Sequence, residues 1–179
     1  MRKSGKGVVR ILMVCHGNIC RSTMAEYVMR HLVEQRGLSS RILVDSAAAT
    51  RDAEGWAVHR GTREVLRQHN VPCGDHRAWV MSKSDYDRYD LICGMDEENL
   101  ADIYHILGGR ARRGWRWQPM SSSEMAASDP DGKVHLLLDW SDRPRAIADP
   151  WYTDDFEATY RDVLEGCESL LAHLVREGA

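Results

Sequence analysis

The stretch VVRILMVCHGNICRS, residues 8–22, decides the fold of this chain. Its first half, Val8–Cys15, is short, apolar and rich in β-branched residues, which is typical of a buried strand. The second half contains a glycine and an asparagine and leads into Met24–Arg36, where apolar residues recur at helical spacing. A strand, a tight turn and a helix in this order predict the first unit of a parallel α/β sheet.

The rest of the chain repeats this alternation. Strands are expected at Arg41–Ala47 and Tyr89–Met95, a strand or short buried turn at Val134–Trp140, and helices at Thr62–His69, Glu97–Leu107 and Asp155–Arg176. Thr23 and Glu26 have the spacing of a capping box, so the first helix is expected to begin after Thr23. The pattern predicts a three-layer α/β/α fold with a central, mainly four-stranded parallel sheet. Ligands of such folds bind beyond the carboxyl ends of the strands, where Cys15 lies.

The composition excludes several classes of protein. The 179 residues suit one domain, and 43% apolar with 28% charged residues is typical of a globular chain. The net charge of −3 argues against a nucleic-acid partner. We therefore expect a single domain over residues 1–179, in which residues 108–133, rich in Gly, Pro, Ser and Arg, form a long loop or insertion.

Part of that loop, residues 110–117, interleaves arginines with two tryptophans. Two interpretations stay open: a patch for an anionic partner, or a solvated loop that its tryptophans anchor to the body of the protein. One helical turn is expected further along, near Ser123.

The N-terminal segment argues against secretion. It is basic and then apolar like a signal peptide, but Arg10 interrupts the apolar run and no small-residue cleavage site follows. No segment approaches the ~20 apolar residues that a membrane span needs. The chain is therefore expected in the cytoplasm, without membrane contact. Its five cysteines are dispersed and lack metal-ligand spacing, so we expect no disulfide framework, no metal and no cofactor.

The candidate site is the loop after the first strand, Cys15-His16-Gly17-Asn18-Ile19-Cys20-Arg21-Ser22. Its backbone N–H groups and the N-terminus of the next helix can form a nest for phosphate or sulfate. A cysteine in that field is a thiolate nucleophile. Gly17 permits close backbone approach, Asn18 can brace the loop, and Ser22 can donate a hydrogen bond to the sulfur. Arg21 offers two parallel donors to phosphate oxygens.

The spacing of Cys15 and Arg21 is weak support by itself, because arginine is common in this chain. The strand before the loop and the helix after it supply the specificity, since a loop in that position has few uses other than anion binding. The sequence therefore predicts a phosphate loop between the first strand and the first helix.

Four segments that span most of the chain carry a family resemblance. They are Val14–Ser22, Asp45–Ala48, Asp90–Asp96 with Asn99 and Leu100, and Asp149–Tyr152 with Asp155–Glu157. In content and order they resemble the motifs of the low-molecular-weight protein-tyrosine phosphatases. The resemblance implies hydrolysis of phosphotyrosyl proteins through a phosphocysteine on Cys15, and a monomer or weak dimer is expected.

The resemblance also implies roles for residues outside the loop. Asp149 would be the general acid and then the general base, with Pro150 stiffening its loop. Trp151 and Tyr152 would form a wall for the phenyl ring, with Trp56 on the opposing rim.

Three further side chains would support the loop chemistry. Ser46 and His76 would hold Asn18 in place. Cys20 would form a reversible disulfide with Cys15 and protect it from over-oxidation. Plain packing stays an open alternative for Cys20 and for Trp56, and a surface or core role is the default for an isolated His76.

The chain departs from the family pattern at positions that frame the substrate. Thr23 stands where the family usually has proline, Trp79 replaces an arginine, and Thr50–Arg63 matches poorly. These departures concern the choice of substrate more than the chemistry.

Three alternatives to phosphotyrosine hydrolysis have weaker support in the sequence. Related proteins act on phosphoarginine, but the position of Ile19 tends to be threonine in that branch, so Ile19 favours tyrosine. Arsenate reduction on the same fold needs two further cysteines close together, whereas Cys73 and Cys93 are 20 residues apart. A phosphate-binding module without turnover would lack Cys15, Arg21 or the acid, and all three are present.

Overall fold

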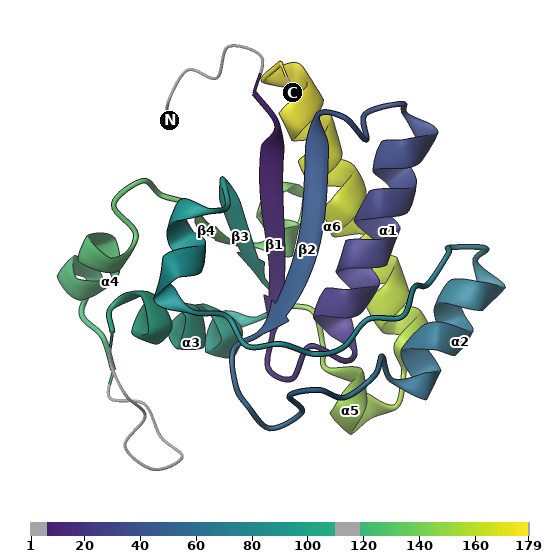
Figure 1. Cartoon of the computed structure of the whole chain (residues 1–179), viewed down its shortest axis with the longest axis horizontal. Helices are drawn as coiled ribbons and strands as arrows, with labels where there is room; N and C mark the ends of the chain where they lie inside the picture. Colours follow the sequence, from purple (N-terminus) through teal and green to yellow (C-terminus); the bar gives the residue numbers. More distant parts are fainter. Residues whose placement is uncertain (1–6, 110–118, 179) are drawn as a thin grey trace.

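The protein forms a four-stranded parallel sheet in the order β2-β1-β3-β4. The computed structural model describes residues 7–109 and 119–178 of the chain. The strands are β1 (Val9–Cys15), β2 (Ile42–Ala48), β3 (Leu91–Gly94) and β4 (Val134–Leu136). The predicted parallel sheet is therefore confirmed, and Figure 1 shows its strands running in one direction.

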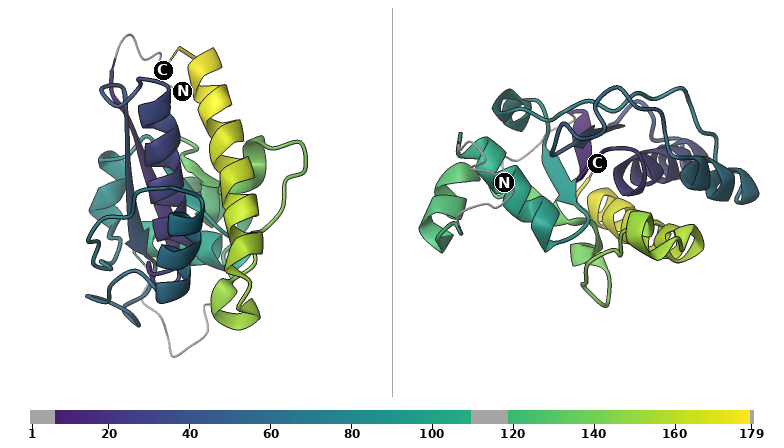
Figure 2. Two further views of the ribbon diagram at one scale, coloured as in Figure 1. Left: turned by 90° about the vertical axis from the view of Figure 1, so that its right-hand side faces the viewer. Right: turned by 90° about the horizontal axis from the view of Figure 1, so that it is seen from below.

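Helices cover both faces of the sheet, as Figures 1 and 2 show. They are α1 (Arg21–Gln35), α2 (Arg60–Gln68), α3 (Glu97–Leu107), α4 (Ser122–Ser128), α5 (Pro150–Thr153) and α6 (Phe156–Arg176), with 3-10 turns η1 (Lys83–Asp87) and η2 (Leu137–Trp140). The helices α1 and α6 pack on one face and α3 on the other. The predicted three-layer α/β/α architecture is confirmed.

The central strand β1 explains why the sheet needs two helical layers. Ile11 and Met13 point into the core beneath α1 and α6, while Leu12 and Val14 point into the core beneath α3. All four are completely buried. Burial of each such side chain contributes about 1.5–3 kcal/mol, so an apolar run without alternation is what a strand covered on both faces requires.

The start of the first helix differs from the prediction. The helix α1 begins at Arg21, not after Thr23, and the capping box of Thr23 and Glu26 is not formed. Thr23 instead donates its hydroxyl to the carbonyl of Cys20 at 2.9 Å, and Glu26 accepts a hydrogen bond from Ser46. Apolar periodicity missed these first residues because Arg21, Ser22 and Thr23 are polar yet buried.

Two other predictions are refined by the structure. The segment Val134–Trp140 contains both expected forms, the short strand β4 followed by the turn η2. The single turn expected near Ser123 is the two-turn helix α4, which begins with a capping box between Ser121 and Glu124. The arginine- and tryptophan-rich segment, residues 110–117, lies outside the described residues.

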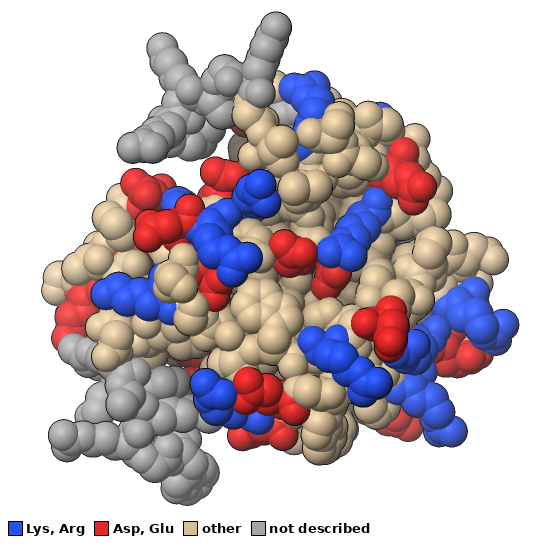
Figure 3. Space-filling view, in the orientation of Figure 1, with Lys and Arg blue, Asp and Glu red and all other residues tan. Residues whose placement is uncertain are grey.

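The described surface carries both signs of charge. Figure 3 shows lysine and arginine interspersed with aspartate and glutamate over one face, and several form short-range pairs such as Arg51 with Glu54 and Arg67 with Glu64. Among residues 7–109 and 119–178, no helix is long and apolar enough to cross a membrane.

Candidate active site

The candidate site lies where β1 ends and α1 begins, at the carboxyl edge of the sheet. Cys15 is the last residue of β1, and Arg21 is the first of α1, so residues 16–20 form the connecting loop. Cys15 is only 3% exposed to solvent. The one-turn helix α5 lies at the same end of the sheet (Figure 1). This is the edge at which ligands of parallel sheets bind.

The sulfur of Cys15 lies 3.0 Å from the hydroxyl oxygen of Ser22. That oxygen already accepts a hydrogen bond from Nδ2 of Asn18 at 2.9 Å. The hydroxyl hydrogen of Ser22 is therefore free to point at the sulfur. Because Ser22 is completely buried, water cannot replace its hydroxyl, and the arrangement supports a negative charge on Cys15.

Asn18 holds the shape of the loop. Its φ of 56° is left-handed, a conformation that asparagine tolerates better than most residues. Its Nδ2 also donates to the hydroxyl of Ser46 at 2.9 Å, and its Oδ1 accepts from Nε2 of His76 at 2.7 Å. The structure thus places Ser46 and His76 against Asn18, the position that the family resemblance implied for them.

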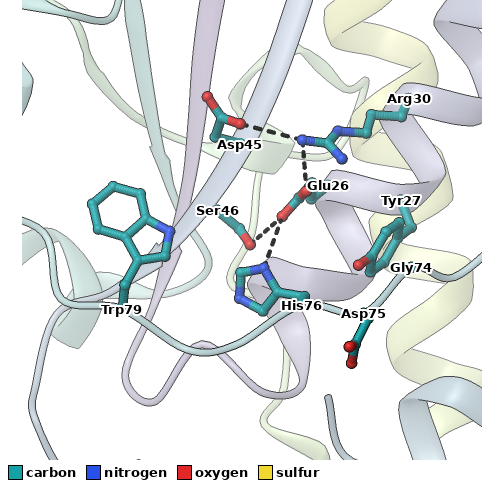
Figure 4. Close-up of a pocket in the computed structure, with 9 residues that line it drawn as sticks. All are labelled: Glu26, Tyr27, Arg30, Asp45, Ser46, Gly74, Asp75, His76 and Trp79. Atoms are coloured by element: carbon teal, nitrogen blue, oxygen red, sulfur yellow. Dashed lines mark hydrogen bonds and ion pairs between the residues drawn. The ribbon is translucent and has the colours of Figure 1, made fainter. Parts of the chain in front are cut away.

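A cavity of about 290 Å³ borders this bracing network at Ser46 and His76 (Figure 4), and Cys15 is not among the residues that line it. Its lining includes Ser46, His76 and Glu26. Glu26 is buried beside the Ser46 hydroxyl at 2.5 Å and the guanidinium of Arg30 at 2.8 Å. Burial raises the pKa of Glu26, and burial followed by the charge of Arg30 lowers the pKa of His76.

Trp79, which stands where the family pattern has an arginine, also lies at this cavity. Trp79 contributes to its lining, and its backbone N–H points at Oδ1 of Asn18 at 3.4 Å. The substitution for arginine therefore leaves a backbone contact to the loop asparagine in place.

Arg21 connects the loop to two distant carboxylates. Its Nη1 lies 2.5 Å from Oδ2 of Asp96 and 3.2 Å from the carbonyl of Ile147, and its Nη2 lies 2.5 Å from Oδ2 of Asp149. Burial lowers the pKa of Arg21, but the charges of Cys15 and Asp149 outweigh it, and the pKa is raised. The buried Nε has no hydrogen-bond partner among the described residues, so a phosphate oxygen would satisfy it.

Asp149 is fixed by its own helix as well as by Arg21. It is the N-cap of α5, with Pro150 at the first helical position. Its Oδ1 accepts the backbone N–H of Trp151 at 3.0 Å. The side chain is 21% exposed, so it lies between the buried arginine and solvent. A proton carrier for a substrate that enters from solvent requires such a position.

Asp96 is a site residue that sequence reasoning did not single out for a role. It caps α3 by accepting the N–H of Asn99 with one oxygen and pairs with Arg21 through the other. The signal was present, because Asp96 follows β3 at the same sheet edge as Cys15. It matched the family segment, but nothing local distinguished it from an ordinary helix cap.

The aromatic residues expected around the pocket are exposed. Trp56 and Trp151 are 55% and 56% exposed, and Tyr152 is 85% exposed. Trp151 and Tyr152 belong to α5, directly after Asp149, whereas Trp56 lies in the segment between β2 and α2. Their faces are therefore accessible to a planar substrate group.

The remaining loop residues take different positions. The imidazole of His16 bonds to Asp52 at 2.7 Å on the surface, which leaves its backbone as the part available to an anion. Ile19 and Cys20 pack in a small apolar cluster with Ala53. Gly17 faces the same residue, since a Cβ on Gly17 would lie 3.4 Å from that of Ala53.

Cys20 is a free, buried thiol in the structure. Burial and then the charge of Cys15 raise the pKa of Cys20 to about 12, so it is protonated at neutral pH. The other buried cysteines, Cys93 and Cys167, belong to the core. Among the residues that the structure describes, no group of three or more His, Cys, Asp or Glu side chains is placed to hold a metal ion.

These features define a class of site: a cysteine nucleophile in an anion-binding loop, with an arginine and a carboxylic acid, suited to phosphate monoesters. Comparisons with known proteins give the family. Residues 10–116 match the family model described as low molecular weight phosphotyrosine protein phosphatase.

Individual relatives agree over nearly the whole chain. The low molecular weight protein-tyrosine-phosphatase YfkJ of Bacillus subtilis is 33% identical over 95% of this chain and 98% of its own. Its crystal structure superimposes with a TM-score of 0.83 over 98% of this chain and 100% of that one, at 31% identity. PtpA of Staphylococcus aureus, which carries the same family name, is 30% identical over 95% of this chain and 96% of its own.

A third relative is named for a different substrate. The crystal structure of DARP, a Drosophila arginine phosphatase, matches with a TM-score of 0.74 and 31% identity over 92% of this chain and 96% of that one. The chain belongs to the low-molecular-weight phosphotyrosine protein phosphatase family, and it is an enzyme of the hydrolase class.

Proposed function

We propose that this enzyme hydrolyses phosphotyrosine on proteins through a phosphocysteine on Cys15, with Arg21 binding the phosphate and Asp149 as general acid and base. One observation carries the assignment. The guanidinium of Arg21, buried in the phosphate loop, lies 2.5 Å from Asp149, which is 128 residues away in the chain. The fold thus brings a nucleophile, a phosphate-binding cation and a proton carrier to one place.

In the first step, the thiolate of Cys15 attacks phosphorus, an S–P bond forms and the P–O bond to the phenol breaks. The backbone N–H groups of the loop and the Arg21 guanidinium hold the equatorial oxygens as charge spreads over them. The phosphate competes with Asp149 for Nη2 of Arg21. Asp149, once protonated and released from that contact, gives its proton to the departing phenolate oxygen.

In the second step, Asp149 takes a proton from a water molecule that attacks the phosphocysteine. The P–O bond to water forms and the S–P bond breaks, which releases inorganic phosphate. The negative charge returns to Cys15, where the hydroxyl of Ser22 at 3.0 Å stabilises it. One carboxyl group therefore serves both steps in succession.

Tyrosine is favoured as the substrate residue by the burial of the nucleophile and by the aromatic residues that follow the acid. Cys15 is 3% exposed, and the exposed Trp151 and Tyr152 follow Asp149 on α5; a long planar phosphotyrosyl side chain would reach so buried a sulfur, and a short phosphoseryl side chain would not. Phosphoarginine is the second candidate, because a similar chain is named as an arginine phosphatase. Ile19 opposes it, since that branch of the family tends to carry threonine there.

The proposal includes the setting of the enzyme. Residues 1–179 would form one domain that acts on phosphotyrosyl proteins in the cytoplasm, as a monomer or weak dimer without a nucleic-acid or membrane partner. The net charge of −3 and the mixed surface charge support this. Cys20 would act as a reversible redox partner of Cys15, which its place in the same loop supports.

The test is a turnover comparison of phosphotyrosyl, phosphoarginyl and phosphoseryl peptides of one sequence, with Cys15→Ser as the blank. The proposal expects the highest kcat/KM for phosphotyrosine and no turnover by the variant. A higher kcat/KM for phosphoarginine would refute phosphotyrosine as the substrate and leave the phosphocysteine mechanism in place. Turnover by a folded Cys15→Ser protein would refute the mechanism.

A further inference from the structure

His59 stands at the junction of three segments of the site. It is the N-cap of α2, and its Nδ1 accepts the backbone N–H of Gly61 at 3.1 Å. Its own backbone N–H donates to the carbonyl of Ile19 in the phosphate loop at 2.8 Å. The backbone of His59 is therefore fixed to the phosphate loop, and its imidazole carries the proton on Nε2.

The imidazole of His59 contacts both ends of the segment that carries Asp149. It stacks on Phe156 with ring centroids 5.0 Å apart and planes 4° apart. It also meets Trp151 edge-on, with centroids 6.0 Å apart and planes at 72°. Such aromatic pairs add to the stabilisation that burial alone provides. Trp151 follows Asp149 by two residues, and Phe156 is the first residue of α6.

The space between α2 and α6 is closely filled at this point. A Cβ on Gly61 would come within 2.5 Å of the Phe156 ring. Phe156 also packs against the cluster that contains Ile19. A displacement of His59 would therefore reach the acid segment and the phosphate loop together.

The Asp149 segment needs such a contact during the reaction. The helix α5 has a single turn in which Pro150 is buried but Trp151 and Tyr152 are mostly exposed, so burial holds only its first residue. In the structure, Arg21 forms an ion pair with Asp149. When a phosphate takes over Nη2 of Arg21, that ion pair is lost, and the hydrogen bond left to the Asp149 carboxylate comes from the backbone N–H of Trp151.

We infer that His59 is a positioning residue, whose ring sets the Asp149 segment against the phosphate loop and so places the general acid over the leaving group. This inference rests on the proposed role of Asp149. His59 touches neither the sulfur nor the phosphate-binding atoms, so its effect passes through Trp151 and Phe156. Misplacement of a catalytic group by about 1 Å can cost about 100-fold in rate.

A second histidine provides a matched control. His69, at the other end of α2, stacks on Tyr160 of α6 with centroids 3.8 Å apart and planes 12° apart. It also pairs with Glu157. It therefore joins the same two helices, but away from Asp149. Loss of its ring should alter stability without altering the placement of the acid.

The experiment compares kcat/KM for two aryl phosphates, phenyl phosphate with a poor leaving group and 2,4-dinitrophenyl phosphate with a good one. His59→Asn keeps a capping acceptor for Gly61 but removes the ring, whereas His59→Phe keeps a ring and removes the acceptor. His69→Asn is the control. Inhibition by inorganic phosphate and the thermal midpoint report whether the phosphate loop and the fold are intact.

The inference expects His59→Asn to lose roughly 10- to 100-fold on phenyl phosphate and less than about 3-fold on dinitrophenyl phosphate, whose leaving group needs no acid. His59→Phe and His69→Asn should stay near the wild type on both esters, with the inhibition constant for phosphate unchanged in all three. Equal losses on both esters in His59→Asn, or no loss, would overturn it. A selective loss in His59→Phe as large as in His59→Asn would show that an aromatic ring at this position does not place the acid, and it would also overturn the inference.

Asp149→Asn in the same series separates this inference from the proposed function. A loss confined to phenyl phosphate in Asp149→Asn, with no such loss in His59→Asn, overturns only the role of His59. Equal losses on both esters in Asp149→Asn would instead refute the acid role itself, and with it the function proposed for the segment.

Discussion

Replacement of Ser22 by alanine should slow the second chemical step far more than the first. In the second step the sulfur of Cys15 leaves as a thiolate, and the Ser22 hydroxyl at 3.0 Å is the side chain placed to stabilise it. Ser22 is completely buried, so no water takes its place. A hydrogen bond to a charged group contributes about 1.5–3 kcal/mol, which corresponds to roughly a 10- to 150-fold loss in rate.

The assay is rapid-mixing kinetics with p-nitrophenyl phosphate, followed at the absorbance of p-nitrophenolate. Slow breakdown of the phosphocysteine should produce a burst of one equivalent of phenolate, followed by a slow steady state. Thr23→Ala is the matched control, because it removes the neighbouring buried hydroxyl, which bonds to the Cys20 carbonyl and not to Cys15. A Ser22→Ala enzyme without a burst, slowed equally in both steps, would refute the reasoning.

Three further changes test separate parts of the structure. Gly61→Ala should destabilise the fold by about 1–3 kcal/mol in urea titration, because its Cβ would come within 2.5 Å of Phe156; unchanged stability would contradict that packing. Burial raises the pKa of Glu26 in the folded protein above its usual value of 4.5. The wild type should therefore lose stability relative to Glu26→Gln as the pH rises from below 4.5 through the folded pKa. The measurement is the free energy of unfolding at several pH values, and a difference that changes in the opposite direction would contradict the prediction. Cys20→Ser should keep kcat within about 2-fold, because a thiol with a pKa of about 12 is neutral at the pH of catalysis. If Cys20 is the redox partner of Cys15, the variant should also fail to regain activity when dithiothreitol is added after treatment with peroxide.

The fold was predictable because its determinants are local. The apolar run of β1, the turn after it and the long apolar stripe of α6 each indicate one element, and strands alternating with helices leave few topologies. The expected helices at Glu97–Leu107 and Asp155–Arg176 correspond to α3 and α6 almost residue for residue. The predicted start of α1 was wrong because the first turn of the helix is polar. Its polar groups are buried because they contact the phosphate loop, and not because they belong to the apolar core.

The site was predictable only in part, because its geometry depends on contacts between distant segments. The loop Cys15–Ser22 could be proposed from its own sequence, whereas Asp149, Ser46 and His76 came from the family resemblance alone. Asp96 could not be distinguished from an ordinary helix cap. The position of a side chain relative to Arg21 depends on how the whole sheet is assembled, so no local sequence pattern predicts it.

His59 illustrates the same limit. In the sequence it lies in the stretch that matched the family pattern poorly, and its neighbours suggest no more than the start of a short helix. Its partners Ile19, Trp151 and Phe156 lie 40 or more residues away on either side. Only the fold brings the ring of His59 against Trp151 of α5 and Phe156 of α6.

The most direct test of the central claim is to trap the covalent intermediate. The enzyme is mixed with a phosphotyrosyl peptide, quenched in acid within the first turnover, digested and analysed by mass spectrometry. The mechanism predicts the added mass of one phosphoryl group on the peptide that contains Cys15, and none in Cys15→Ser. A phosphoryl group on another residue, or rapid turnover without any labelled Cys15, would contradict it.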